Sequence, residues 1–296
     1  MKLELKEITK SFTGKEVLKG ISLRAESGTA FGLLGRNGAG KTTTIRILMD
    51  VFPADGGEIQ IDGKKIDYNK VKLGYLPEER GLYPKKRIDD QLVYFAELNG
   101  MKAKDARISI DRWLGRLGMA EYKSKKLNTL SKGNQQKIQL ITALAHDPDI
   151  IILDEPFSGL DPVNAMLLKD VVKEEIARGK IVLFSSHQMN YIEEFCDDIA
   201  ILNGGKIVLN GNLKELKQRM GGNKIALRTP EKEKLRMQYG LQCAENESGE
   251  FIIQLDENGD IHSEMQKITA QYKIEAVRVY EPSLNDIFVE FAGDQV

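Results

Sequence analysis

The sequence has no apolar run that approaches the roughly 20 residues a transmembrane helix needs, so we expect no membrane span. Its two cysteines, Cys196 and Cys243, stand far apart and in no metal-ligand spacing, which excludes a disulfide framework and fits a reduced cytosolic setting. The formal charge is only −1, so the whole-chain composition shows no electrostatic footprint for nucleic acid or for an anionic membrane surface. The first ten residues, MKLELKEITK, mix both charge signs and are not typical of a signal peptide.

What is present is an ordinary globular composition over 296 residues, with 41% apolar and 29% charged residues. This length allows one large domain or two, each with enough apolar residues for a core of its own. Among the three histidines, His146 and His262 are interpreted as ordinary helix-end or surface residues.

The first two thirds of the chain predict an α/β domain. Ala30–Leu34, Ile150–Leu153 and Ile181–Phe184 are short and almost purely apolar, as are strands of a parallel sheet that is covered on both faces. Asp62-Gly63 and Gly204-Gly205 separate apolar stretches in the manner of hairpin turns. Between about residues 84 and 145 the apolar spacing becomes helical, which predicts an insert of three helices, at Ile88–Leu98, Ala103–Leu117 and Lys132–Ala145.

A second, smaller domain is expected after the flexible sequence Gly221-Gly222-Asn223. The order of elements there is strand, helix, strand, strand, helix, strand, with the third element expected at Leu241–Ala244. That order is typical of a ferredoxin-like α+β fold, and a short helix follows from Ser283 to Phe291. The domains are therefore predicted at 1–220 and 224–296.

The strongest chemical signal is GRNGAGKT at Gly35–Thr42, which satisfies the phosphate-loop pattern between a predicted strand and a predicted helix. Glycines let successive backbone N–H groups converge on phosphate oxygens, and the helix adds its positive N-terminal end. Lys41 supplies a cation to the β and γ phosphates, and the Thr42 hydroxyl can ligate Mg²⁺. The sequence therefore predicts that a nucleoside triphosphate binds here.

Two acidic residues follow the buried strand Ile150–Leu153. Carboxylates at such a position are costly unless they meet a metal or a cation, which makes Asp154 the candidate for the Mg²⁺ site. Glu155 comes where the strand ends and could activate water as a general base. A neighbouring predicted strand ends in Ser185-Ser186-His187, so His187 is expected at the same edge of the sheet.

The stretch LSKGNQQK at Leu130–Lys137 precedes a predicted helix. Ser131 is a good N-cap, and together with Gly133 it forms a small-residue helix start that could receive an anion.

In this order, GRNGAGKT, LSKGN, IIILDEP, SGLD at Ser158–Asp161 and SSH closely resemble the ATP-binding subunit of an ABC transporter. The resemblance covers roughly residues 1–220. It implies a P-loop NTPase fold with a mixed-sheet core, an antiparallel β subdomain and a helical insert.

The resemblance also assigns roles by position. Phe12 corresponds to the aromatic residue that stacks on adenine, Glu155 is the catalytic carboxylate, and His187 is the switch histidine. Glu78 stands where a glutamine is usual and is a further candidate catalytic residue. Asp154 is the Mg²⁺ carboxylate, with Thr42 and Glu78 as further candidate metal ligands. The residues implied in nucleotide binding are Phe12, Gly35, Arg36, Asn37, Gly38, Ala39, Gly40, Lys41, Thr42, Thr43, Ser131, Gly133 and Asp161.

Two departures from the family pattern stand out. The usual LSGGQ is LSKGN here, which keeps Ser131 and Gly133 but introduces Lys132 and Asn134. Glu78 replaces the glutamine and adds negative charge beside the expected phosphates. We expect the first change to tune binding, and the role of Glu78 stays open at this point.

The C-terminal part, ending in EPSLNDIFVEF at Glu281–Phe291, is similar to that of exporter ATPases of the ABC-2 type, which serve drug, antibiotic or sodium efflux. The resemblance as a whole implies ATP and Mg²⁺ as cofactors, a second cassette as partner, most simply a second copy, and a separate transmembrane permease. It also implies a cytoplasmic protein held at the inner face of the membrane through the permease.

Two other functions fit part of the sequence. One is a soluble ABC-type ATPase that acts on ribosomes or DNA, although no paired cassette or basic patch supports it. The other is an ATP-gated regulatory switch without transport, which the Glu78 and LSKGN departures favour. The transported molecule is not encoded here, because its recognition belongs to the permease.

Overall fold

The computed structural model describes residues 1–79, 81–158, 160–186, 188–246, 249–256 and 259–292. They divide into two compact units, Met1–Asn212 with Phe291 and Ala292, and Leu213–Glu290. Helix α7 (Leu213–Gly221) falls in the second unit, so the division precedes this helix instead of following it at residue 220.

The first unit is built on a mixed sheet of six strands in the order β10-β9-β3-β8-β7-β6. The strands from β9 to β6 are parallel, and β10 pairs with β9 antiparallel. Every residue of the three central strands is buried, as their continuous apolar sequences predict. The strands are β3 (Ala30–Gly35), β6 (Leu73–Leu76), β7 (Ile150–Asp154), β8 (Ile181–Ser185), β9 (Asp198–Asn203) and β10 (Lys206–Asn212).

This sheet places the predicted site residues at one edge. Because β3, β7 and β8 are parallel, their carboxyl ends meet on the same side. In the ladder, Ser185 pairs with Leu33 on β3 and with Asp154 on β7. The loop that follows Gly35 therefore starts at the same edge of the sheet as Asp154 and Glu155, with the end of β8 between them.

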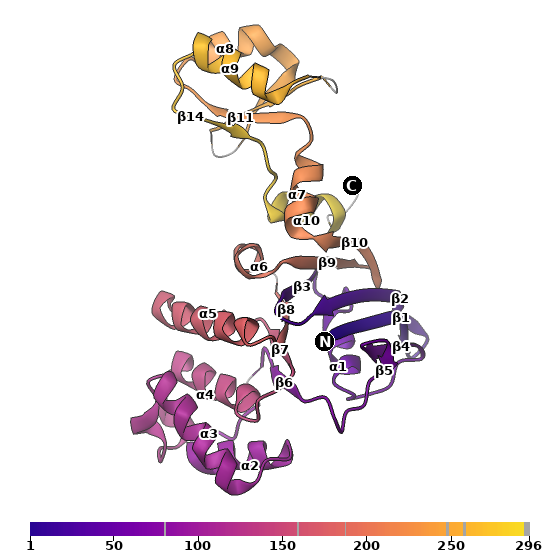
Figure 1. The fold of residues 1–296 in the computed structure, drawn as a ribbon, viewed down its shortest axis with the longest axis vertical. Coiled ribbons are helices and arrows are strands. Elements are labelled where there is room, and N and C mark those ends of the chain that lie inside the picture. Colours follow the sequence, from indigo (N-terminus) through magenta and orange to yellow (C-terminus); the bar gives the residue numbers. More distant parts are fainter. Residues whose placement is uncertain (80, 159, 187, 247–248, 257–258, 293–296) are drawn as a thin grey trace. The chain divides into compact units, whose positions relative to one another are not determined.

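An antiparallel sheet of order β2-β1-β4-β5 covers helix α1 (Lys41–Leu48) and one face of the central sheet (Figure 1). A tight turn at Thr13-Gly14, both with positive φ, joins its first two strands. One hydrophobic core, which includes Leu5, Ile45 and Ile152, joins the two sheets and α1. The strands are β1 (Lys2–Phe12), β2 (Lys15–Glu26), β4 (Gly56–Ile61) and β5 (Lys64–Lys65).

The helical insert is present as predicted. Its helices are α2 (Ile88–Leu98), α3 (Ala103–Arg116) and α4 (Lys132–Leu144), which pack together (Figure 1). Their buried residues recur at helical spacing, as in Ile88, Leu92 and Ala96 of α2.

One strand and three α-helices have no counterpart among the sequence predictions. Strand β6 is only four residues long and contains a glycine, so it shows no clear periodicity. The helices are α5 (Pro162–Ala177), α6 (Met189–Phe195) and α7.

The second unit has the predicted ferredoxin-like order of elements, with an antiparallel sheet of order β12-β13-β11-β14. One predicted strand begins too early: Leu241 lies in a 3₁₀ turn and is fully exposed, and the strand starts at Cys243 because Gly240, with positive φ, ends the preceding helix. The elements are β11 (Lys224–Arg228), α8 (Lys232–Tyr239), β12 (Cys243–Glu245), β13 (Phe251–Gln254), α9 (Ile261–Gln271) and β14 (Ala276–Val279), followed by α10 (Leu284–Ala292).

Candidate functional site

The glycine-rich loop between β3 and α1 has the backbone that phosphate binding needs. Gly40, the N-cap of α1, has φ +116, and a Cβ there would lie 2.6 Å from the Leu18 side chain. Only glycine fits this position, and it provides no side-chain cap for the helix. The first N–H groups of α1 therefore meet no capping side chain, and they can receive an anion. Gly38 also has a positive φ and is exposed.

Lys41 begins the helix and folds back over this loop. Its Nζ donates to the carbonyl oxygens of Gly35, at 2.6 Å, and Arg36, at 3.3 Å. Burial lowers the pKa of the Lys41 ammonium, whereas the negative charges of Glu155, Asp154 and Glu78 raise it. The structure thus brings the Lys41 ammonium, which is predicted to bind phosphate, close to all three predicted carboxylates.

Asp154 is the last residue of β7 and is almost completely buried. Burial raises the pKa of its carboxyl group, and the neighbouring Glu155 acts in the same direction. The Tyr75 hydroxyl donates to Asp154 Oδ2 at 3.4 Å and stabilises the charged form. Burial and this carboxylate together raise the pKa of Tyr75 to about 12.

Glu155 is also buried, and its backbone is unusual. Its φ of +48 is in the left-handed region, which is uncommon for a residue with a side chain. The end of β8 holds it: Glu155 N donates to Ser185 O at 2.8 Å, and the Ser186 hydroxyl donates to Glu155 Oε2 at 2.9 Å. Ser186 belongs to the SSH motif, but the sequence predicted no role for it in orienting Glu155. His187, the third residue of that motif, lies outside the described residues.

Glu78 is exposed and follows β6. The backbone on both sides of it is fixed by α4, because Gln139 Nε2 donates to the carbonyls of Pro77, at 3.2 Å, and Glu79, at 3.0 Å. Sequence reasoning did not single out Gln139. The available signal was a single amide between Ile138 and the apolar pair Leu140 and Ile141.

Ser131, Gly133 and Asp161 form a second cluster. Ser131 caps α4 as predicted, its hydroxyl accepting from Asn134 N at 3.3 Å. Asp161 caps α5 in the same way, accepting from Asn164 N at 2.9 Å. The two helix starts touch, because a Cβ on Gly133 would lie 2.9 Å from Asn164 Nδ2. In Figure 1, α4 and α1 lie on opposite sides of β7 and β8, so within one chain this cluster is separate from the glycine-rich loop.

Phe12 lies at the end of β1 with 42% of its surface exposed, as a side chain that stacks on a planar ligand must be. The Phe52 ring, which was not predicted to take part, stands perpendicular to it at 5.4 Å. Lys10 Nζ lies 5.6 Å from both ring centres. Of the other loop residues, Arg36, Asn37 and Thr42 are exposed, Thr43 is half-buried and Ala39 is buried.

The oxygen donors present fit Mg²⁺ that arrives with a nucleotide. Mg²⁺ usually keeps several waters and takes one or two protein oxygens together with substrate phosphates. Thr42 offers an exposed hydroxyl, and Asp154 a carboxylate that faces Lys41. Among the described residues, no three His, Cys, Asp or Glu side chains are grouped to hold a metal by themselves.

Comparison with known proteins decides the family. The family described as ABC transporter matches residues 18–158, and the family described as ATP-binding protein DrrA1-3-like, C-terminal domain, matches residues 211–292. The ABC transporter ATP-binding protein YhaQ of Bacillus subtilis is 41% identical over 293 residues, which are 98% of each chain. The chain belongs to the ABC transporter ATP-binding proteins.

Other members of this family match over similar lengths. The linearmycin resistance ATP-binding protein LnrL of Bacillus subtilis is 30% identical over 305 residues, which cover 98% of each chain. A solved structure of the ATP-binding subunit of an ABC transporter superposes with a TM-score of 0.68 and 28% identity, covering 75% of this chain and 94% of that one. This ABC transporter subunit therefore has the fold that its sequence motifs imply.

Membership establishes the general function. The chain is the ATP-binding subunit that powers a separate membrane-spanning component of an ABC transporter. No helix in the described part of the chain has the length and apolarity to cross a bilayer.

Proposed function

We propose that this ABC transporter subunit hydrolyses ATP to ADP and phosphate at the edge formed by β3, β7 and β8. The observation that carries the proposal is the position of Lys41, between a glycine-shaped helix start and the carboxylates of Asp154, Glu155 and Glu78. The backbone N–H groups of Gly35–Thr43 bind the phosphates, Lys41 neutralises part of their charge, and the exposed ring of Phe12 stacks on adenine.

Thr42 and Asp154 are the residues that would hold Mg²⁺, with the exposed Glu78 as a further candidate. When bound, the ion would neutralise charge on the phosphate oxygens. Burial makes the negative charge of Asp154 costly, and this cost favours the arrival of a cation.

Glu155 is the proposed general base, which orients and deprotonates the attacking water. Three features support this role: its carboxylate is buried, Ser186 fixes one oxygen, and its backbone is strained. The family resemblance gives His187 a part in the same step.

The site is proposed to become complete only when a second copy closes over it. Ser131, Gly133 and Asp161 lie at the starts of α4 and α5, and α4 lies on the opposite side of β7 and β8 from α1, the helix that follows the glycine-rich loop (Figure 1). The start of α4 in a facing subunit would therefore cap the γ-phosphate. ATP then favours the closed dimer because that state binds it better, and hydrolysis releases the dimer.

The helical insert is the proposed docking surface for the permease. Tyr83 and Tyr94 are exposed beside Phe95, with ring centres 6.1 and 5.5 Å from the Phe95 ring, which makes an aromatic surface of the kind enriched at interfaces. Through the permease, the subunit would be held at the inner face of the membrane. LnrL is named for linearmycin resistance, and a 28% identical relative from Burkholderia pseudomallei is the Nod factor export ATP-binding protein I, so the proposed direction is export.

The test is nucleotide binding by Lys41→Ala. Titration with a fluorescent ATP analogue and Mg²⁺ should show binding to the wild type and at least tenfold weaker binding to the variant. Lys173 is an exposed lysine on α5, so Lys173→Ala is the control and should bind like the wild type. Equal affinity of Lys41→Ala and wild type would overturn the proposed site.

A further inference from the structure

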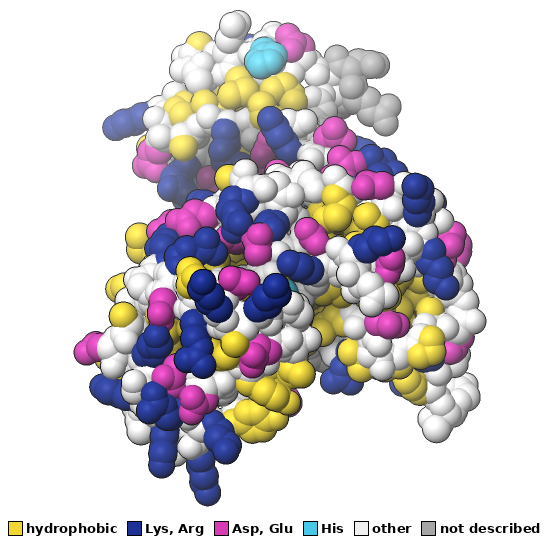
Figure 2. Space-filling model, turned by 60° about the horizontal axis from the view of Figure 1, so that its bottom comes forward, with side chains coloured by type: hydrophobic (Ala, Val, Ile, Leu, Met, Phe, Trp, Pro, Cys, Tyr) yellow, Lys and Arg dark blue, Asp and Glu magenta, His cyan; other side chains and the backbone are white. Residues whose placement is uncertain are grey.

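Charge is distributed unevenly along this nearly neutral chain. Residues 84–137, which include most of the helical insert, contain thirteen Lys and Arg and six Asp and Glu, whereas the whole chain carries only −1. In Figure 2, many Lys and Arg side chains crowd the lower left of the view, where the helical insert lies. The whole-chain average therefore conceals a basic subdomain, and the expectation of no electrostatic footprint does not hold for this part.

Within the insert, two basic segments are brought together. Lys85–Arg87 precedes α2, and Lys123–Lys126 follows α3. An antiparallel bridge joins Arg87 to Lys126, and Ile88 N donates to Lys125 O at 3.0 Å. We call these two segments the lysine ribbon.

Among the described residues, ion pairs are found for two of its six cations. Arg87 Nη2 pairs with Asp89 at 2.6 Å, and Lys123 Nζ pairs with Asp111 at 2.5 Å. The other four are exposed, and no contact with a carboxylate is found for them among the described residues. These four are Lys85, Lys86, Lys125 and Lys126.

We propose that the lysine ribbon binds an anionic membrane surface. Four to eight basic residues clustered near a membrane are attracted to anionic lipids, and each contributes independently of a defined pairing geometry. The four cations without a carboxylate contact are all lysines, which are flexible point charges suited to a diffuse layer of headgroups; one of them, Lys125, has its Nζ 4.5 Å from the centre of the Tyr122 ring. A fixed carboxylate or phosphate pocket would instead favour the planar fork of arginine.

The position of the ribbon agrees with a lipid partner. Pro84 alone separates Lys85 from Tyr83, so the ribbon continues directly from the aromatic surface proposed to meet the permease. Tyrosine beside lysine is typical of membrane–water interfaces, where the ring lies at headgroup level. In this respect the inference rests on the proposed function. The electrostatic attraction itself requires only the ribbon.

The experiment measures flotation of the purified full-length protein with two kinds of vesicle, phosphatidylcholine alone and phosphatidylcholine with phosphatidylglycerol. Wild type should bind only the anionic vesicles, and binding should weaken at high salt, because the screening length falls from about 10 Å at 0.1 M to about 3 Å at 1 M. The variants are Lys85→Gln with Lys86→Gln, and Lys125→Gln with Lys126→Gln.

Each double variant should lose about 10- to 30-fold in partitioning, since each lysine near an anionic surface contributes about fivefold. The control is Lys64→Gln with Lys65→Gln, an adjacent exposed pair on β5, which should partition like the wild type. ATP-analogue binding and far-UV circular dichroism show that each variant is folded. They also separate this inference from the proposed ATP site, which can hold even when vesicle binding fails.

Three results would overturn the proposal. One is a wild type that ignores anionic vesicles, and another is equal binding to neutral ones. The third is a β5 control whose binding to anionic vesicles falls as much as that of the ribbon variants. If the ribbon variants assembled poorly with the permease in neutral detergent while wild type ignored vesicles, the partner would be an acidic protein segment instead of lipid.

Discussion

The side-chain amide of Gln139 lies 3.0 Å from the carbonyl oxygen of Glu79, and the same nitrogen also donates to Pro77 at 3.2 Å. Both hydrogens of one buried amide thus hold the backbone on either side of Glu78. Gln139 belongs to α4, the helix that Ser131 caps. One residue therefore ties α4 to the segment that carries Glu78, a candidate site carboxylate.

Gln139→Leu should remove both hydrogen bonds while filling the same space. We expect a loss of about 1–2 kcal/mol in the free energy of unfolding, because two carbonyls lose their donor. ATP turnover should fall by a larger factor than ATP-analogue affinity, because the Glu78 segment is no longer held. Urea unfolding and steady-state ATPase assays measure the two effects.

Thr142→Val is the matched control for Gln139. Its hydroxyl donates to Ile138 O within the same helix and does not reach the Glu78 segment. Turnover in this variant should stay near wild type. Equal losses of turnover in both variants would show that Gln139 acts only through helix stability.

Glu155→Gln should slow ATP hydrolysis by about 10²–10⁴, because the amide cannot accept the proton of the attacking water. Its shape and the contact with Ser186 are kept, so nucleotide affinity should persist and ATP-bound dimers should accumulate. Phosphate release and size-exclusion chromatography with ATP test this. Glu175→Gln, at another buried glutamate, should lower stability but keep turnover per folded molecule, and wild-type hydrolysis by Glu155→Gln would remove Glu155 from the mechanism.

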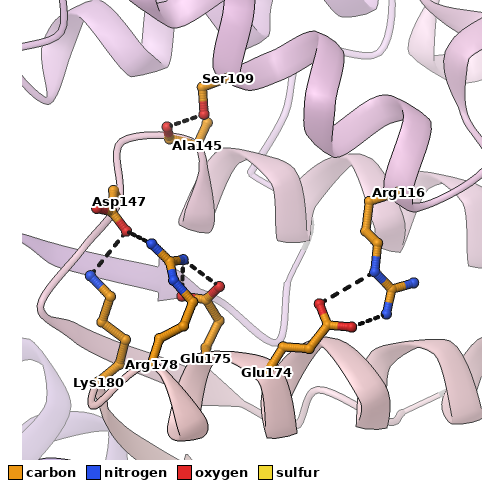
Figure 3. Close-up of polar contacts among 8 residues, drawn as sticks. All are labelled: Ser109, Arg116, Ala145, Asp147, Glu174, Glu175, Arg178 and Lys180. Carbon is orange, nitrogen blue, oxygen red and sulfur yellow. Dashed lines mark hydrogen bonds and ion pairs between the residues drawn. The ribbon is translucent and has the colours of Figure 1, made fainter.

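Replacement of Arg116 and replacement of Arg178 should lower the free energy of unfolding by different amounts (Figure 3). Arg116 pairs with the exposed Glu174, and such surface pairs contribute at most about 1 kcal/mol. Arg178 instead pairs at 2.7 Å with Glu175, whose side chain is only 4% exposed, and at 2.9 Å with Asp147. Arg178→Ala leaves the buried carboxylate of Glu175 without its arginine partner, so the free energy of unfolding should fall by about 3 kcal/mol.

Chemical unfolding of Arg116→Ala and Arg178→Ala under identical conditions provides this comparison. If the Arg116 variant were as destabilised as the Arg178 variant, burial of the acidic partner would not determine how much stability is lost.

His146 should make stability sensitive to mild acid. The sequence suggested a helix-end or surface histidine, but the ring is only 3% exposed and its Nε2 lies 2.9 Å from Leu73 O. Burial lowers the pKa of His146; the Leu73 carbonyl and Asp147 oppose that shift, whereas Lys72 and Lys180 add to it. Below about pH 6.5 the unfolded chain then binds a proton that the folded chain resists.

Stability should therefore be highest above pH 6.5 and fall as the pH drops from there toward the lowered folded pKa. His146→Gln, which does not titrate, should show a flatter profile between pH 7 and 5.5. Denaturant midpoints across this range test the prediction. Exposed His262 supplies the control, since His262→Gln should keep the wild-type slope.

Residues that act through local backbone geometry were predictable from the sequence. The glycines of Gly35–Thr42 permit the tight turn that precedes α1, and Ser131 caps the helix that follows it. The α/β core, the helical insert and the ferredoxin-like order follow from apolar periodicity in the same way. Strand β6 did not, because four residues with a glycine carry too little pattern.

Partners that are distant in the chain could not be found in this way. Gln139 reaches Glu79 across 60 residues, and Ser186 reaches Glu155 across 31. Neither belongs to a local pattern that predicts its partner, since each depends on which strand ends and helices the fold places side by side.

The sequence by itself determined that this protein has a glycine-rich turn before a helix, two carboxylates at the end of a buried strand and a helix capped by Ser131, because each feature depends on adjacent residues whose conformation is set locally. The tertiary structure alone decided which charges meet. It placed Lys41 before three carboxylates and joined two basic segments, more than 30 residues apart, into one ribbon, because Coulomb interactions depend on distance in space and not on separation along the chain.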